Sequence, residues 1–168
     1  MSELTEFRDG KDSYFREDHH SPLTEEQRST FRGLNYYGER PDLRYITSLN
    51  QYEQVEVVDL QTSTGNIASY LRWGKISFET DGKEVDLTIF KDQGGDNLFL
   101  PFADATSGNE TYGAGRYLDT VMQPDGHLRV DFNYAYNPYC AYNEHWSCPL
   151  TPSENRLSVA IRAGERSF

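Results

Sequence analysis

The chain has 168 residues, of which 36% are hydrophobic and 14% aromatic, and its formal net charge is -11. This length suits one ordinary domain, and so many aromatic residues argue against a disordered chain. The negative charge argues against nucleic acid and anionic membranes as partners, because their phosphates would repel the protein.

No stretch has the apolar length of a membrane helix, and the first residues lack the apolar core of a secretory signal. We therefore expect a cytoplasmic protein, which the two cysteines do not contradict. The acid-rich, lysine-poor composition has two explanations of equal weight. One is a halophilic protein from a high-salt cytoplasm, and the other is an acidic protein from a GC-rich genome.

Two helices are predicted at the start of the chain. The first covers residues 2–18, with Ser2 as its N-cap and acidic residues in its first turn. The second begins after the capping residue Thr24, reaches about Arg32 and ends at Gly33.

From Tyr36 onward, apolar and polar residues alternate with the period of two that is typical of strands. The predicted strands are 44–49, 54–60, 68–73, 75–79, 84–90, 97–102 and 157–161. Because Asp-Gly turns separate short strands, we expect a mainly β fold, an antiparallel sandwich or barrel with a short helical segment at its N-terminus. Residues 1–168 then form a single domain, with 1–33 as the helical segment and 36–168 as the β domain.

A hairpin within residues 116–134 can be placed in register. Pro124, Asp125 and Gly126 form a turn signal whose glycine suits a left-handed position. This turn pairs Val121 with Arg129 and puts apolar residues on one face. The same register places Asp119 opposite Asp131 on the other face.

Like charges directly across a ladder destabilise it, so Asp119 and Asp131 need an explanation. The first is that Arg129 and water screen them. The functional alternatives are a bound cation, or a pair of carboxylates that share one proton.

Two segments carry most of the polar residues that suit chemistry. The first, 101–119, is rich in glycine and hydroxyl groups and ends near Arg116, a planar donor for carboxylate or phosphate. It lacks the lysine and the following helix of a phosphate-binding loop. The second, 131–157, passes from a polar strand into an aromatic loop limited by prolines.

These segments give the chain a recognisable pattern. It resembles the uncharacterised prokaryotic family called domain of unknown function 1684, most specifically over 102–119, 131–148 and 154–165. The resemblance starts at Lys11-Asp12 and covers nearly the whole chain, apart from a shorter loop between Asn50 and Gln54. It implies the family fold and a shared site, but no activity.

The two cysteines, Cys140 and Cys148, allow four interpretations. They are inert packed thiols, ligands of a metal together with His145 and Asp131, or a disulfide. In the fourth interpretation one of them is a catalytic thiolate, which needs a base or positive charge nearby, for which His145 and Arg116 are the candidates. Their spacing is not a standard zinc spacing, and a reducing cytoplasm disfavours the disulfide.

Tyrosine and asparagine side chains recur through both segments, where they either wall a pocket or hold loops in shape. The candidate ligand-binding residues are Thr106, Tyr112, Arg116, Tyr117, Asn133, Tyr136, Asn137 and Asn155. The candidate catalytic residues are Asp119, Asp131 and Cys140. A divalent metal is the one cofactor considered, and its candidate ligands are Asp119, Asp131, His145 and Cys148.

Three functions follow from these residues. The favoured one is binding of a small molecule or ion in a polar pocket between segments 102–119 and 131–155. The alternative is a hydrolase-type enzyme in which an aspartate is the base or metal ligand and Arg116 holds an anion. In the third, a structural or partner-binding role, the polar side chains are consumed by loop backbone.

Overall fold

The strands form two antiparallel sheets in the computed structural model, which describes residues 1–168. One sheet has the order β2-β3-β4-β5-β6 and the other the order β1-β8-β7. The strands are β1 (Arg44–Ser48), β2 (Asn50–Gln61), β3 (Ile67–Thr80), β4 (Lys83–Lys91), β5 (Leu98–Phe102), β6 (Arg116–Asp119), β7 (Val121–Met122) and β8 (His127–Asp131). The helices are α1 (Glu3–Glu17), α2 (Glu25–Thr30) and the 3-10 turns η1 (Pro41–Leu43), η2 (Phe132–Tyr134), η3 (Tyr139–Ala141) and η4 (Ser153–Asn155).

Side chains from both sheets fill one main core. Ile76 and Leu87 from the larger sheet join Leu128 and Val130 from the smaller one, and each is 0% exposed. Burying a side chain of this kind stabilises the fold by about 1.5–3 kcal/mol. Each sheet ends in free edge strands and does not close into a barrel. The predicted mainly β fold is therefore confirmed, and of the two expected architectures it is the sandwich.

Both predicted helices form with the predicted caps. The Ser2 hydroxyl accepts a hydrogen bond from the Thr5 backbone N–H at 3.1 Å. Thr24 and Gln27 form a reciprocal capping box at the start of α2. This second helix ends at Thr30, two residues earlier than expected, and Gly33 follows it at a φ of 132°.

Two strand predictions need correction. Residues 68–73 and 75–79 belong to the single strand β3, which bends at Gly74 while its register to β4 shifts by one residue. Residues 157–161 form no strand. There the Ile161 N–H donates to the Asp104 side chain, so a carboxylate replaces the ladder partner that a strand would need.

The hairpin turn has the predicted register, with Val121 opposite Arg129 and Gly126 at a φ of 86°. The expected pair Asp119–Asp131 does not form. Asp119 lies opposite Phe99 in the larger sheet, whereas Asp131 lies opposite Arg44 in the smaller one. The chain changes sheets between β6 and β7, which separates the two aspartates.

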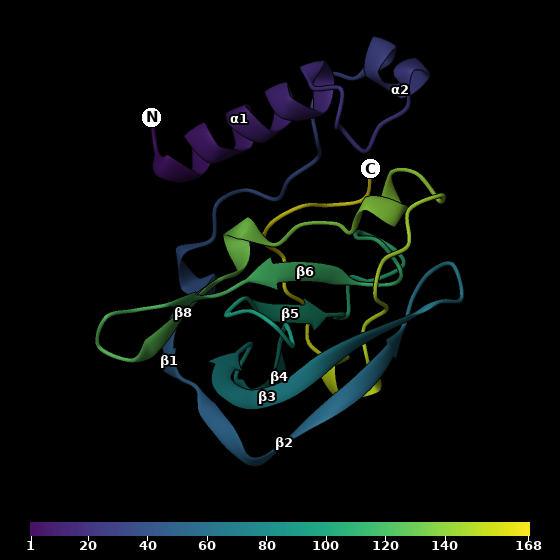
Figure 1. Cartoon of the computed structure of the whole chain (residues 1–168). Coiled ribbons are helices and arrows are strands. Elements are labelled where there is room, and N and C mark those ends of the chain that lie inside the picture. Colours follow the sequence, from purple (N-terminus) through teal and green to yellow (C-terminus); the bar gives the residue numbers. More distant parts are fainter.

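The helices α1 and α2 lie on one side of the molecule, beside the edge strand β6 and far from β2 (Figure 1). Phe15 anchors α1 there, because its ring is 1% exposed and stacks edge-on against Tyr142 at 5.1 Å. None of the helices is long and apolar enough to span a membrane.

Candidate functional site

A groove of about 730 Å³ is lined by residues of α1 on one side and by residues of β6, β7, β8 and the segment that follows β8 on the other. Its size is in the range of small-molecule sites. The residues that line it are Glu3, Glu6, Phe7, Gly10, Lys11, Tyr14, Phe15, Asp119, Val121, Arg129, Asp131, Tyr134, Tyr136 and Tyr139. The structure therefore brings Asp119, Asp131 and Tyr136 to one groove, although the two aspartates do not pair.

Asp119 lines the groove with an exposed carboxylate. The Tyr136 hydroxyl donates to Asp119 Oδ1 at 3.0 Å. Burial raises the pKa of Tyr136, and the negative charge of Asp119 raises it further, so the phenol stays protonated and able to donate. Asp119 makes no ion pair with any arginine or lysine.

Asp131 is held quite differently. Its carboxylate accepts from Arg44 Nε at 3.0 Å and from the Asn133 backbone N–H at 3.0 Å, and Arg129 Nη2 lies 3.6 Å away. Asn133 also donates its side-chain amide to Asp131 at 2.9 Å. The Asp131 carboxylate is therefore occupied by two arginines and by hydrogen bonds within the chain, and it has a structural role.

Lys11 and Glu165 were not predicted as site residues, and they form the wall behind Tyr136. The Lys11 ammonium pairs with the Glu165 carboxylate, which is 1% exposed. The Tyr142 hydroxyl donates to the same carboxylate. Lys11 Nζ also lies 5.0 Å from the centre of the Tyr136 ring, a cation–π distance. The sequence signal for both was their place in the family-like pattern, which starts at Lys11 and ends at Glu165.

Arg116 is 1% exposed and does not line the groove. Its guanidinium donates to the backbone carbonyls of Ala163, Glu165 and Ile161. Asp104 Oδ2 lies 3.5 Å from Arg116 Nη2 and balances its charge. Arg116 therefore ties the C-terminal segment to β6 and does not reach a ligand in the groove.

Most of the other candidate ligand-binding residues also serve the fold. Asn155 accepts from the Thr88 N–H and donates to the Thr88 and Pro101 carbonyls, each at 2.8 Å. Asn133 likewise brackets the Arg40 backbone, accepting at 2.7 Å and donating at 2.9 Å. These amides fasten irregular loops to the sheets.

Three further candidates make similar contacts. The Thr106 hydroxyl donates to Asp104 at 2.7 Å, and the Tyr117 hydroxyl donates to the Pro149 carbonyl. Asn137 donates to the Arg166 carbonyl at 3.0 Å, while its side-chain oxygen is buried with no partner.

Cys140 and Cys148 are reduced and adjacent. The Cys140 N–H donates to Cys148 Sγ at 3.3 Å, and the Tyr112 hydroxyl lies 3.6 Å from Cys140 Sγ. Cys140 borders a second, open hollow of about 510 Å³ beside α2, which shares no lining residue with the groove. The candidate catalytic residues thus fall into two places, with the aspartates in one and the thiol in the other.

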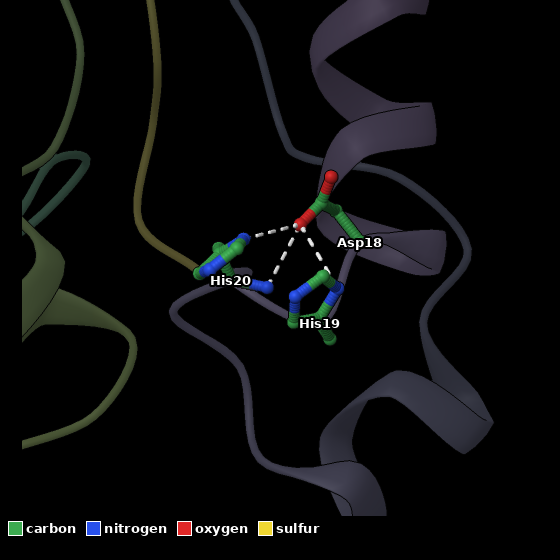
Figure 2. Close-up of side chains that lie close together, drawn as sticks. All are labelled: Asp18, His19 and His20. Atoms are coloured by element: carbon green, nitrogen blue, oxygen red, sulfur yellow. Dashed lines mark hydrogen bonds and ion pairs between the residues drawn. The ribbon is translucent and has the colours of Figure 1, made fainter.

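The candidate metal ligands are not assembled. His145 is exposed in a turn, Cys148 is buried beside Cys140, and Asp119 and Asp131 lie in the groove. The three side chains whose ligand atoms do lie within 4.8 Å of one another are Asp18, His19 and His20 (Figure 2).

Figure 2 shows both histidine rings beside the Asp18 carboxylate, just after α1 ends. Asp18 Oδ1 accepts the His20 N–H at 2.8 Å and lies 3.3 Å from His20 Nδ1. The backbone hydrogen bond lowers the pKa of Asp18. A carboxylate and two imidazoles are suitable ligands for Zn²⁺.

Fold and groove together define a two-sheet β-sandwich domain with an N-terminal helix that forms one groove wall. The chain belongs to the family described as protein of unknown function (DUF1684), whose model matches residues 29–166. This confirms the family resemblance expected from the sequence. The matched range begins after α1, so the helix that closes the groove lies outside it.

One solved structure extends the comparison to the whole chain. It is the solution NMR structure of an uncharacterized protein of Haloarcula marismortui, with 40% sequence identity and a TM-score of 0.74. The similarity covers 97% of this chain and 91% of that one. No curated protein matches the sequence significantly.

Proposed function

We propose that the groove between α1 and β6 binds a small organic cation, with Asp119 as the charged contact. The observation that carries the proposal is the exposed, unpaired Asp119 carboxylate in an aromatic groove of small-molecule size. The Tyr136 hydroxyl donates to Asp119 Oδ1 at 3.0 Å, and Asp119 Oδ2 accepts no hydrogen bond from the chain. Binding rather than catalysis is favoured because Cys140 borders a different hollow.

The charges of the lining favour a cation over an anion. Both cationic side chains in the groove are already paired, Lys11 with Glu165 and Arg129 with Asp131. The carboxylates of Asp119, Glu3 and Glu6 have no cationic side chain as a partner. The two glutamates lie in the first turn of α1, where their negative charge also stabilises the positive end of the helix dipole. A ligand therefore meets uncompensated negative charge at this site.

Aromatic rings supply the remaining contacts. Six of the lining residues are aromatic: Phe7, Tyr14, Phe15, Tyr134, Tyr136 and Tyr139. Cations bind favourably over the faces of such rings, and Lys11 already does so on Tyr136 and Phe15. Apolar walls with one carboxylate are suited to an ammonium or guanidinium group on an apolar body.

Benzylammonium and benzoate provide a matched pair of probes, since they share a ring and differ in charge. We expect calorimetry to detect binding of benzylammonium and little or no binding of benzoate. The measurement is made at low ionic strength, because salt would screen the exposed carboxylate. In NMR spectra, the backbone signals of the groove residues should shift with benzylammonium.

Asp119→Asn removes the charge and keeps the side-chain shape, so benzylammonium should bind about tenfold or more weakly, equivalent to about 1.4 kcal/mol. Asp125→Asn is the matched control, because Asp125 lies in the β7–β8 turn outside the groove and the charge change is the same. Equal losses in the two variants, or equal affinity for benzoate, would show that the groove does not select cations. The absence of benzylammonium binding would also refute the proposal.

A further inference from the structure

We infer that Cys140 is a reactive thiol that hydroperoxides oxidise, and that Cys148 then closes a Cys140–Cys148 disulfide. This oxidation site is independent of the organic-cation groove, because the two hollows share no lining residue. It rests on three features: the contact between the two thiols, the donors around Cys140, and the hollow that reaches it.

The two cysteines lie within reach of a disulfide. Cys140 sits on the 3-10 turn η3, and its backbone N–H donates to Cys148 Sγ at 3.3 Å. A fixed backbone holds Cys148 in place, since the Cys148 carbonyl accepts from the Ser63 N–H at 2.9 Å and its N–H donates to Ser63 Oγ at 3.1 Å. A disulfide requires the two cysteines to lie close together, and this 3.3 Å contact brings them close.

The surroundings of Cys140 favour its thiolate. The Tyr112 hydroxyl lies 3.6 Å from Cys140 Sγ, and the side chains of Cys148 and Ser63 are its other hydrogen-bonding neighbours. These hydrogen bonds lower the pKa of Cys140, while burial opposes the shift. The contact between the two thiols, together with burial, raises the pKa of Cys148, so this residue stays protonated. Reactive cysteines are those with a stabilised thiolate.

Access to Cys140 comes from the hollow beside α2. Its lining includes Cys140 together with polar residues such as Gln27, Glu144 and His145. Gln27 ties α2 to this loop by donating to the Tyr142 carbonyl at 2.8 Å. Cys148 does not line the hollow, so a small oxidant meets Cys140 first.

The chemistry takes two balanced steps. The Cys140 thiolate attacks one oxygen of hydrogen peroxide, the O–O bond breaks, and Cys140 becomes a sulfenic acid as hydroxide leaves. The Cys148 thiol then attacks the sulfenic sulfur, the S–S bond forms, and water leaves with the Cys148 proton. The protein loses two electrons and the peroxide gains them.

The test uses the reduced full-length chain and intact-mass spectrometry under non-reducing conditions. With hydrogen peroxide at neutral pH, the wild-type protein should form the intramolecular disulfide at least about tenfold faster than free cysteine is oxidised, because only a few per cent of free cysteine is thiolate at this pH. Since the chain has only two cysteines, each product can be assigned to a residue by peptide mapping.

Variants separate the two roles. Cys148→Ser should accumulate a sulfenic acid at Cys140 that a cyclic diketone traps, whereas Cys140→Ser should lose fast oxidation. Tyr112→Phe keeps both sulfurs, removes one donor and should slow the first step several-fold. Circular dichroism reports whether the cysteine variants fold, and the wild-type rate decides the matter if they do not. Oxidation of wild-type protein no faster than free cysteine, or only after unfolding in urea, would overturn the inference.

Discussion

Replacing Arg116 by methionine tests whether this buried arginine holds the C-terminal segment in place. Methionine fills a similar volume but carries no charge and no donor. The change leaves the Ala163, Glu165 and Ile161 carbonyls without their guanidinium donor, and it leaves Asp104 without its cation. We expect a fold that is much less stable but still assembled, because Arg116 lies outside the main apolar core.

The size of the effect follows from burial. Removing one partner of a buried ion pair costs about 3–5 kcal/mol, because the other charge stays buried without compensation. Asp104 keeps hydrogen bonds from Thr106 and Ser107 at 2.7 and 3.2 Å, which places the expected loss in the lower half of that range. With a urea m-value of about 2 kcal/mol/M, the midpoint should fall by about 1.5–2 M.

Urea unfolding followed by circular dichroism measures this loss. Arg156→Met is the matched control, because Arg156 is exposed and the expected change lies within about 0.5 kcal/mol. The double change Arg116→Met with Asp104→Asn should be less harmful than the two single losses added together, since it removes both charges. A loss below about 1 kcal/mol for Arg116→Met would refute the idea that this contact anchors the C-terminal segment.

Three further outcomes are expected. Burial raises the pKa of several tyrosines, most strongly that of four, so the unfolded chain releases these protons at about pH 10 while the folded chain retains them. Stability should therefore be complete below that pH and fall above it, by up to about 1.4 kcal/mol per tyrosine and pH unit. A flat urea midpoint between about pH 9 and 11 would contradict this. The four tyrosines are Tyr36, Tyr117, Tyr136 and Tyr142. Gly65→Ala should lower the free energy of unfolding by about 1–2 kcal/mol, because Gly65 has a positive φ that alanine disfavours. Gly164→Ala should lower it at least twice as much, because at Gly164 a Cβ would also lie 2.7 Å from a carbonyl oxygen. Similar losses in the two variants on thermal unfolding would refute the steric argument. Zn²⁺ should shift the NMR signals of the His19 and His20 rings before that of His127, and equal shifts would show that Asp18 makes no selective site.

The strand pattern and the turns were predictable because both depend on local residues. The turn at Pro124, Asp125 and Gly126 fixes its own register, and the structure has that register. The change of sheets after Asp119 has no comparable signal in the sequence. An alternating pattern continues through Thr120, although the chain passes from one sheet to the other there.

The strand predicted at 157–161 shows a different limit of sequence reasoning. Val159 and Ile161 are buried as an alternating strand requires, at 3% and 0% exposure. Their backbone groups instead bond to segment 104–105, through the Asp104 side chain and the Ala105 N–H. An alternation of apolar and polar residues predicts which side chains are buried. It does not predict which groups form hydrogen bonds with the backbone N–H and C=O groups.

The candidate site was predicted in part. Asp119, Asp131 and Tyr136 do share a groove, because the polar faces of β6 and β8 both turn toward α1. The role of α1 itself could not be seen, since its contacts depend on residues far away in sequence. Buried polar residues such as Arg116 and Asn155 resemble binding residues in composition, and only their hydrogen bonds reveal that they hold loops.

The ion pair between Lys11 and Glu165 joins positions 154 residues apart. On the ribosome, α1 therefore emerges long before its partner Glu165 is synthesised. Until then the apolar side of α1, with Leu4 and Phe15, has no finished surface to cover. The wall formed by Lys11 and Glu165 can assemble only after Glu165 has been synthesised, and a chain that stalls short of Glu165 would present a loose amphipathic helix to chaperones and proteases.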